Sequence, residues 1–191
     1  MSKRIRVAVI AGGRSSEHEI SVESARSVMG GLDPDRYDVK AIEIHRDGRW
    51  ELGPGDAREL GRPVAETGSP PEVLGQVDVV LPILHGPFGE DGTVQGLLEL
   101  AGVPYVGAGV TASALCMDKD LFKAVCRDKG IPVTRSVTVR NGDRPDNPFG
   151  YPVFVKPARL GSSVGISKVG EEGELQEAVD LARRHDEKVL I

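Results

Sequence analysis

The stretch IRVAVIAGGRSSEHEIS, residues 5–21, decides how the first half of this chain folds. Its apolar part, residues 5–10, predicts a buried strand, and the glycine pair that follows predicts a sharp turn. A helix should come next, because Val22, Ala25 and Met29 lie three to four residues apart. A strand, a glycine turn and a helix start together present backbone N–H groups that can bind an anion.

The residues at the ends of this helix also predict its limits. Ser16 and Glu19 have the spacing of a capping box at the start of the helix. Gly30 and Gly31 are typical of a C-terminal cap. The first helix is therefore expected to lie between these two pairs.

Strands and helices continue to alternate through the first half, which is typical of a doubly wound parallel sheet. Strands are expected over 37–44, 77–84 and 103–106, a hairpin edge over 49–52, and a helix around 94–101. The stretch 54–76 is rich in glycine and proline and is expected to be irregular surface structure. The first domain is accordingly predicted to be α/β and to cover residues 1–110.

The pattern changes in the second half, residues 111–191, where strands and helices no longer alternate regularly. A long helix is expected over about 111–129 and a shorter one around 175–182, with strands over 133–139, 152–157, 166–169 and 188–191. This half is predicted to form a second domain.

Composition excludes several classes of function. Hydrophobic residues make up 39% of the 191-residue chain, as in a globular protein, and the net charge of −5 gives no electrostatic support for nucleic-acid binding. No stretch has the length of a membrane span, and the N-terminus lacks a signal-peptide pattern. Cys116 and Cys126 are expected to be reduced, buried thiols of a cytoplasmic protein.

Two loops carry candidate substrate-binding residues. Glu17 and Glu19 follow the first strand, and His85 follows a neighbouring strand of the predicted sheet. Ligands of open α/β sheets bind in the crevice at the carboxyl ends of such strands. A carboxylate there can hold an ammonium group, although a plain turn and a histidine bonded to the backbone fit the same residues. Asp91 is expected to cap the next helix.

Lys119 is a candidate cation on a buried helix face. Leu115, Phe122 and Cys126 define an apolar stripe at helical spacing, and Lys119 falls on it. A lysine there must extend to solvent or find an anionic partner. Asp118 offers a local partner or a cap at which the helix restarts.

Lys156 and the loop that follows it predict a phosphate site. Lys156 lies at the end of an apolar strand, and Gly161-Ser162-Ser163-Val164-Gly165 follows shortly after. Backbone N–H groups and hydroxyls of such a loop can bind phosphate oxygens, while the lysine supplies a charge. No Walker A sequence is present, and an exposed hairpin with a solvated lysine is the alternative.

Taken in order, these motifs resemble the D-alanine–D-alanine ligases of the ATP-grasp superfamily. The resemblance is carried by AGGRSSEHEIS, LHG with GEDGTVQG, PYVG, SALCMDK, VKP and GSSVG, at residues 11–21, 84–86, 89–96, 104–107, 113–119, 155–157 and 161–165. It implies a doubly wound pre-ATP-grasp domain, followed by the α+β central subdomain of an ATP-grasp fold.

The resemblance also implies a reaction and roles for residues. ATP phosphorylates one D-alanine to an acyl phosphate, and a second D-alanine attacks it, which supplies peptidoglycan synthesis. Glu17 would hold the ammonium of the first D-alanine, and His85 would line its site. Lys119 and Lys156 would contact ATP phosphates. The loop residues Gly161, Ser162 and Ser163 would cover the nucleotide, with Ser162 linked to Glu17 through hydrogen bonds.

The resemblance further implies parts that this sequence lacks. The adenine hinge and the ligands of Mg²⁺ or Mn²⁺ are expected in a C-terminal part, so the 191 residues alone are expected to be inactive. A homodimer without nucleic-acid or membrane partners is also implied. Three alternatives stay open: a D-alanine–D-lactate ligase, another ATP-grasp carboxylate–amine ligase, and a non-catalytic ligand-binding fragment.

Overall fold

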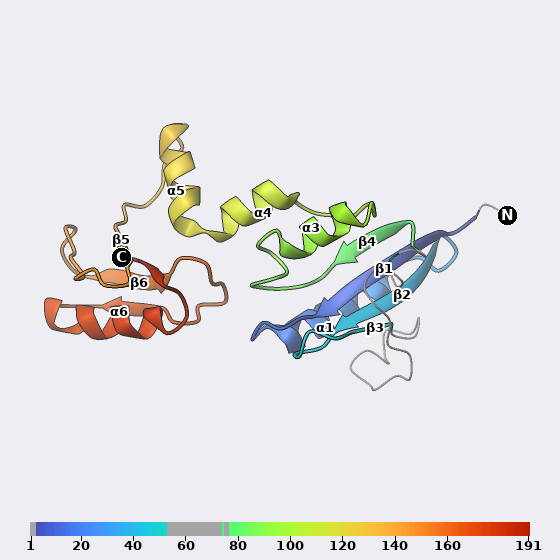
Figure 1. Ribbon diagram of the computed structural model, residues 1–191, viewed down its shortest axis with the longest axis horizontal. Helices are drawn as coiled ribbons and strands as arrows, with labels where there is room; N and C mark the ends of the chain where they lie inside the picture. Colours follow the sequence, from blue (N-terminus) through green and yellow to red (C-terminus); the bar gives the residue numbers. More distant parts are fainter. Residues whose placement is uncertain (1–2, 53–73, 75–76) are drawn as a thin grey trace. The chain divides into compact units, whose positions relative to one another are not determined.

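The computed structural model describes residues 3–52, 74 and 77–191 and divides into two compact units. The first unit is Met1–Ala114 and the second is Leu115–Ile191. Figure 1 shows the strands and helices of each unit. The predicted irregular stretch 54–76 lies almost wholly outside the described residues.

The first unit is built on a sheet with the strand order β3-β2-β1-β4. Its central strand β1 pairs in parallel with β2 and β4, while β3 adds an antiparallel edge. The strands are β1 (Ile5–Gly12), β2 (Tyr37–Ile44), β3 (Trp50–Leu52) and β4 (Val79–Pro82). The predicted strand over 103–106 is reduced to an isolated bridge between Val80 and Tyr105.

Successive side chains of β1 point to opposite faces of this sheet, and both faces are covered. Val7 and Val9 pack with Val22 and other residues of α1 (His18–Gly31) on one face. Ala8 and Ile10 belong to a second cluster, which includes Val94 and Leu98 of α3 (Thr93–Leu100). A strand buried on both faces explains the nearly unbroken apolar run of the sequence.

The first helix has other ends than those predicted. Its N-cap is Glu17 and no side chain caps it, so the capping box of Ser16 and Glu19 is wrong. At the other end the helix includes Gly31 and is capped at Leu32. Two hydrogen bonds instead fix the turn that precedes the helix: Gly12 N–H donates to Ser21 Oγ at 2.8 Å, and Gly13 N–H donates to Ile44 O at 2.6 Å.

The second unit contains an antiparallel sheet with the strand order β5-β8-β6-β7. Its strands are β5 (Thr138–Arg140), β6 (Val153–Pro157), β7 (Ser167–Val169) and β8 (Lys188–Leu190). The helix α6 (Leu175–Arg183), preceded by the 3₁₀ turn η2 (Glu172–Glu174), packs on it through a shared apolar cluster. The predicted strand over 133–139 is shorter than expected, since only β5 forms.

The predicted helix over 111–129 is two helices, α4 (Val110–Met117) and α5 (Lys119–Asp128). Asp118 separates them because its backbone is extended, with φ −84° and ψ 98°, and its carboxylate accepts from the first N–H groups of α5. The predicted buried stripe is also only partly right. Cys126 is buried, whereas Phe122 is 40% exposed.

Two expectations that rest on composition can also be compared with the structure. Cys126 is buried as predicted, but Cys116 of α4 is exposed, so that part of the prediction is wrong. No helix among the described residues combines the length and the apolar character needed to cross a lipid bilayer.

The turn after β1 predicts a sharp difference between two glycines. Gly12 has φ +85°, and a Cβ there would lie 2.4 Å from Ile44 O, whereas Gly31 has nothing within 4 Å of its Cβ position. Gly12→Ala should therefore lower the free energy of unfolding by about 1–3 kcal/mol. Gly31→Ala, the matched control, should leave it unchanged or raise it by up to about 1 kcal/mol. Urea denaturation of both variants measures the difference, and equal midpoints would contradict the strain assigned to Gly12.

Candidate functional site

The two loops with candidate substrate-binding residues meet in the first unit. They leave the carboxyl ends of β1 and β4, which are parallel neighbours. Ser15 Oγ donates to His85 O at 2.8 Å, and Ser21 Oγ donates to Ile83 O at 2.5 Å. Sequence reasoning assigned no role to these two serines, which join the loops.

Glu17 lies against the second loop. Its backbone N–H donates to Ser15 Oγ at 3.2 Å, and its side chain is partly buried. Gly86, with φ +71°, packs so closely that a Cβ there would lie 2.4 Å from Glu17 Oε2. The glycine after His85 therefore makes room for the carboxylate of Glu17, which is held at the junction of the loops.

His85 is held at the same junction. Its Nε2 lies 3.3 Å from Ser24 Oγ of α1, and its carbonyl accepts from Ser15. Glu90 Oε2 accepts from Gly86 N–H at 2.7 Å and so fixes the turn after the histidine. Ser24 was not predicted, although it follows Ser21 by three residues and so lies on the same helix face.

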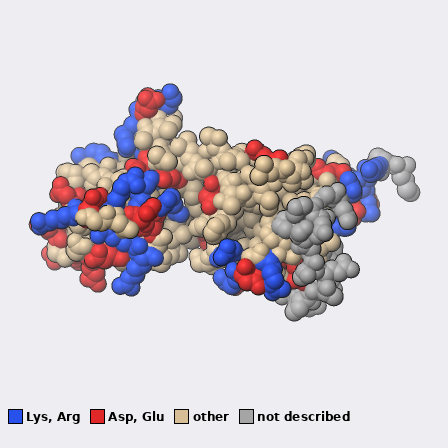
Figure 2. All heavy atoms as spheres, in the orientation of Figure 1, with Lys and Arg blue, Asp and Glu red and all other residues tan. Residues whose placement is uncertain are grey.

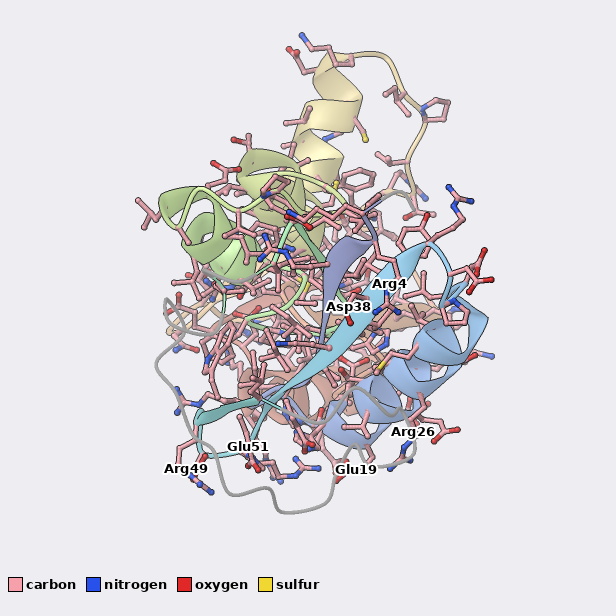
Figure 3. All side chains as sticks on the ribbon, turned by 90° about the vertical axis from the view of Figure 1, so that its right-hand side faces the viewer. Arg4, Glu19, Arg26, Asp38, Arg49 and Glu51 are labelled. Atoms are coloured by element: carbon pink, nitrogen blue, oxygen red, sulfur yellow. The ribbon has the colours of Figure 1, made fainter. Side chains whose placement is uncertain are left out.

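Two other acidic residues of these loops have structural partners. Glu19 is exposed and pairs with Arg46 at 2.5 Å, so it is not held at the loop junction as Glu17 is. Figure 3 places it at the end of the first unit where Arg49 and Glu51 also lie. Asp91 accepts from Phe88 N–H at 2.9 Å and from Thr93 N–H at 3.0 Å. Its carboxylate thus binds the first N–H group of α3, but the N-cap position is Gly92, so the predicted N-cap at Asp91 is wrong by one residue.

A cavity of about 340 Å³ lies beside the loop junction. The glycine pair after β1 and His85 contribute to its wall, together with apolar side chains such as Leu84 and Trp50. Arg14 and Phe88 also line it, with the Arg14 guanidinium carbon 5.6 Å from the centre of the Phe88 ring. The first unit thus offers a small, mainly apolar hollow beside a carboxylate and an imidazole.

Lys156 of β6 lines a pocket of about 330 Å³ in the second unit. Two further cationic residues, Lys123 and Arg135, also line this pocket. The rest of the lining is mostly apolar or hydroxylic: Thr134, Ser136, Phe149, Pro152, Val153, Phe154, Leu190 and Ile191. An apolar surface beside several cations suits a ligand that has a flat ring system at one end and phosphates at the other.

Lys119, at the start of α5, is half-buried and lies against the chain that leads into the glycine-serine loop. Its Nζ donates to Leu160 O at 2.7 Å and to Ala158 O at 3.2 Å. Burial and the positive charge of Lys156 lower the pKa of Lys119, while the carboxylates of Asp186 and Asp118 oppose that shift. The expected anionic partner is therefore replaced by two carbonyl oxygens.

Lys123 is a cation that sequence reasoning missed. It follows Lys119 by four residues on α5, and its Nζ donates to Thr134 O and Thr134 Oγ1 at 2.8 and 2.7 Å. Burial lowers the pKa of Lys123, and repulsion by Lys156 and Arg127 adds to this. The spacing of the two lysines places them on one face of the helix, which is a signal in the sequence.

The glycine-serine loop has an unusual backbone. Ser162 and Ser163 are exposed and adopt left-handed conformations, with φ +50° and +59°. Such values are uncommon outside glycine and often mark ligand-binding or switch regions. Gly165 has φ +68°, and a Cβ there would lie 2.7 Å from the His185 ring, so only glycine closes this turn.

A metal ion in a protein is usually held by several histidine, cysteine, aspartate or glutamate side chains. Among the residues that the structure describes, no group of three or more histidine, cysteine, aspartate or glutamate side chains could hold a metal ion. Charges of both signs are interspersed on the visible face of the second unit (Figure 2). Glu17 lies in the first unit and Ser162 in the second, so the predicted hydrogen-bond link between them stays a prediction.

Comparison with protein families gives two matches along the chain. A model described as D-ala D-ala ligase N-terminus matches residues 6–108, and one described as D-ala D-ala ligase C-terminus matches residues 125–191. The D-alanine–D-alanine ligase of Mycolicibacterium gilvum is 48% identical over 223 residues, which cover 100% of this chain and 61% of that protein. The chain thus spans less than two thirds of the length of this relative.

Solved structures give the same result. The VanG D-Ala:D-Ser ligase of Enterococcus faecalis aligns with a TM-score of 0.83 and 37% identity, over 98% of this chain and 62% of that one. The D-alanine–D-alanine ligase of Bacillus anthracis complexed with ATP aligns with a TM-score of 0.77 and 28% identity, over 97% and 57%. These matches confirm the predicted fold class. The chain belongs to the D-alanine–D-alanine ligase family.

Proposed function

We propose that this chain carries the D-alanine site and the ATP-phosphate site of an ATP-dependent D-alanine–D-alanine ligase. The observation that carries the proposal is the pocket where Lys156, Lys123 and Arg135 surround apolar side chains, in a chain of this family. In this proposal residues 1–110 form the substrate-binding domain and residues 111–191 form the central ATP-grasp subdomain.

ATP is the nucleotide that we propose for the second unit. The ATP complex of the Bacillus anthracis relative supports this choice. Lys156 would contact a phosphate from the pocket wall, and the loop residues Gly161, Ser162 and Ser163 would cover the nucleotide with N–H and hydroxyl donors. The Lys119 ammonium has three N–H donors, of which two bind carbonyls here, so a phosphate oxygen can take the third.

D-Alanine is the substrate that we propose for the first unit. Glu17, held against Gly86, would bind the ammonium of the first D-alanine, and His85 would line the site beside it. The D-alanine carboxylate would attack the terminal phosphorus of ATP, forming an acyl phosphate and releasing ADP. The amine of a second D-alanine would then attack the acyl carbon, lose a proton and release phosphate. A hydrogen-bond link from Ser162 to Glu17 would couple loop closure to a filled substrate site and exclude water.

The second candidate function differs in the acceptor that attacks the acyl phosphate. The VanG D-Ala:D-Ser ligase aligns at 37% identity, whereas the D-alanine–D-alanine ligase of Bacillus anthracis aligns at 28%. Overall similarity therefore does not select the acceptor, and a ligase that joins D-alanine to D-serine or to D-lactate is the second candidate. Assays with the three acceptors in competition would decide between them.

Further parts of the proposal rest on the family alone. They are a role in peptidoglycan precursor synthesis, a cytoplasmic location, a homodimer, and a requirement for Mg²⁺ or Mn²⁺.

The substrate site can be tested through Glu17. In the full-length protein, Glu17→Gln should raise KM for the first D-alanine and lower kcat, because a charge-assisted contact worth about 2–3 kcal/mol is lost. Glu19→Gln is the matched control, since Glu19 pairs with Arg46 on the surface. Steady-state kinetics of both variants measures the effect. Wild-type kinetics for Glu17→Gln would remove this residue from the site.

The nucleotide site can be tested through its lysines. Lys156→Ala and Lys119→Ala should each weaken ATP binding, and the loss should be larger at low salt because screening is weaker there. Lys168→Ala is the control, because this lysine of β7 is exposed and lies outside the Lys156 pocket. Isothermal calorimetry with ATP gives the affinities. Equal affinities for wild type and both site variants would contradict the proposed phosphate contacts.

A further inference from the structure

A buried ion pair holds the start of α5 against β8. Asp118 Oδ1 accepts from the N–H groups of Asp120 and Leu121 at 3.1 and 3.2 Å, while its Oδ2 accepts from Lys188 Nζ at 2.6 Å. Asp118 and Lys188 are each 6% exposed. One carboxylate thus caps the helix and binds the strand at the same time.

The same pair fixes the surroundings of Lys119. Lys119 directly follows Asp118, and its backbone N–H donates to Ala158 O at 3.0 Å. Ala158 N–H in turn donates to Lys188 O at 2.9 Å. Ala158 is therefore held by α5 on one side and by β8 on the other, and it is one of the two carbonyls that bind Lys119 Nζ.

A second pair anchors the next residue of this segment. Arg159 donates to the buried carboxylate of Asp186 through its backbone N–H at 2.8 Å and through its guanidinium at 2.6 Å. Asp186 also accepts from Lys188 N–H at 3.0 Å. Burial alone would raise the pKa of Asp186, but the hydrogen bonds from Arg159 and Lys188 outweigh it and keep the pKa below its usual range.

Stability alone does not account for two ion pairs with buried carboxylates, Asp118–Lys188 and Arg159–Asp186, around residues 158–160. A buried ion pair contributes little compared with a well-packed apolar pair, because both charges lose their hydration. It does hold two backbone segments in one relative position, since the charges must stay in contact. The segments joined here carry Lys119 and the residues that enter the glycine-serine loop.

We propose that Asp118 and Lys188 are positioning residues, which hold Lys119 and residues 158–160 where Lys119 can meet a phosphate of the nucleotide. They act through Lys119 and do not touch the substrate themselves. The inference rests on the proposed function, because it takes Lys119 to be a phosphate ligand.

The test replaces both charges while it keeps the shape. In the full-length protein, Asp118→Asn keeps a side-chain oxygen for the helix cap, and Lys188→Met fills the same space without a charge. The double variant should keep its melting temperature within a few degrees and its KM for D-alanine. Its KM for ATP should rise on the order of 10-fold, because a misplaced group costs up to about 100-fold.

The pH dependence of ATP affinity provides a second readout. Asp118 and Asp186 raise the pKa of Lys119, against burial and Lys156. Without the charge of Asp118 the pKa of Lys119 should fall further. Phosphate binding needs the protonated amine, so the loss of ATP affinity at high pH should begin at a lower pH in the single variant Asp118→Asn, which removes the carboxylate and keeps the positive charge of Lys188. A role of Asp118 in stability alone would not change the pH at which ATP affinity is lost, which is the alkaline limb of the pH profile.

The control is another ion pair of the same chain. Arg6 and Asp78 pair at 2.7 Å in the first unit, whereas Lys119 and the residues that bind it belong to the second unit. Arg6→Met with Asp78→Asn should leave KM for ATP and the alkaline limb unchanged. If the Asp118→Asn/Lys188→Met variant does not fold, Asp118→Asn with Lys188→Gln carries the same comparison, because a neutral hydrogen bond then replaces the ion pair.

The outcomes distinguish a failure of the positioning role from a failure of the proposed function. If Lys119→Ala weakens ATP binding but the double variant binds ATP like wild type, the positioning role is wrong and the proposed function stands. If the double variant only loses thermal stability, or raises the KM for ATP and the KM for D-alanine equally, the positioning role is also wrong. If Lys119→Ala and Lys156→Ala both bind ATP normally, the proposed phosphate site itself fails.

Discussion

The parallel pairing of β1 with β2 and β4 is the constraint on which the first unit depends. Both faces of β1 are buried. At the end of the strand the chain turns sharply at Gly12, which has φ +85°. Because β1 and β4 run in the same direction, the loops after them emerge at the same edge. This places Glu17 against Gly86, the residue that follows His85, although the two loops are far apart in the sequence.

The second unit uses another means to bring residues together. Its antiparallel strands place Lys156 opposite Leu190 of β8, and the buried charges of Lys188 and Asp186 join β8 to α5 and to the entry of the glycine-serine loop. Of the cations near this loop, Lys119 and Lys123 bind carbonyl and hydroxyl oxygens, and Lys156 is placed by strand pairing. Burial lowers the pKa of Lys119 and of Lys123, and repulsion by Lys156 adds to both shifts.

Much of this arrangement could be predicted from residue patterns. The limits of β2 and the existence of α1, α3, β6 and α6 follow from periodicity and from glycine and proline positions. As expected, the candidate residues Glu17 and His85 lie in the loops that follow β1 and β4, and Lys156 lies near the end of β6. The break between α4 and α5 was expected only as an alternative, a cap at Asp118 where the helix restarts, because helix propensity continues across 111–129. The structure confirms this alternative, since Asp118 is extended and is the N-cap of α5.

By itself, the sequence determined the α/β class, the order of the elements, the family and the kinds of side chain available for binding. Only the tertiary structure decided which of these side chains meet. It turned Glu19 to the surface with Arg46, placed Ser15, Ser21 and Ser24 between the loops, and gave Lys119 carbonyl partners in place of an anion. The reason is physical: periodicity encodes which face of an element is buried, whereas a hydrogen bond between distant residues depends on strand pairing and on packing, which no local pattern records.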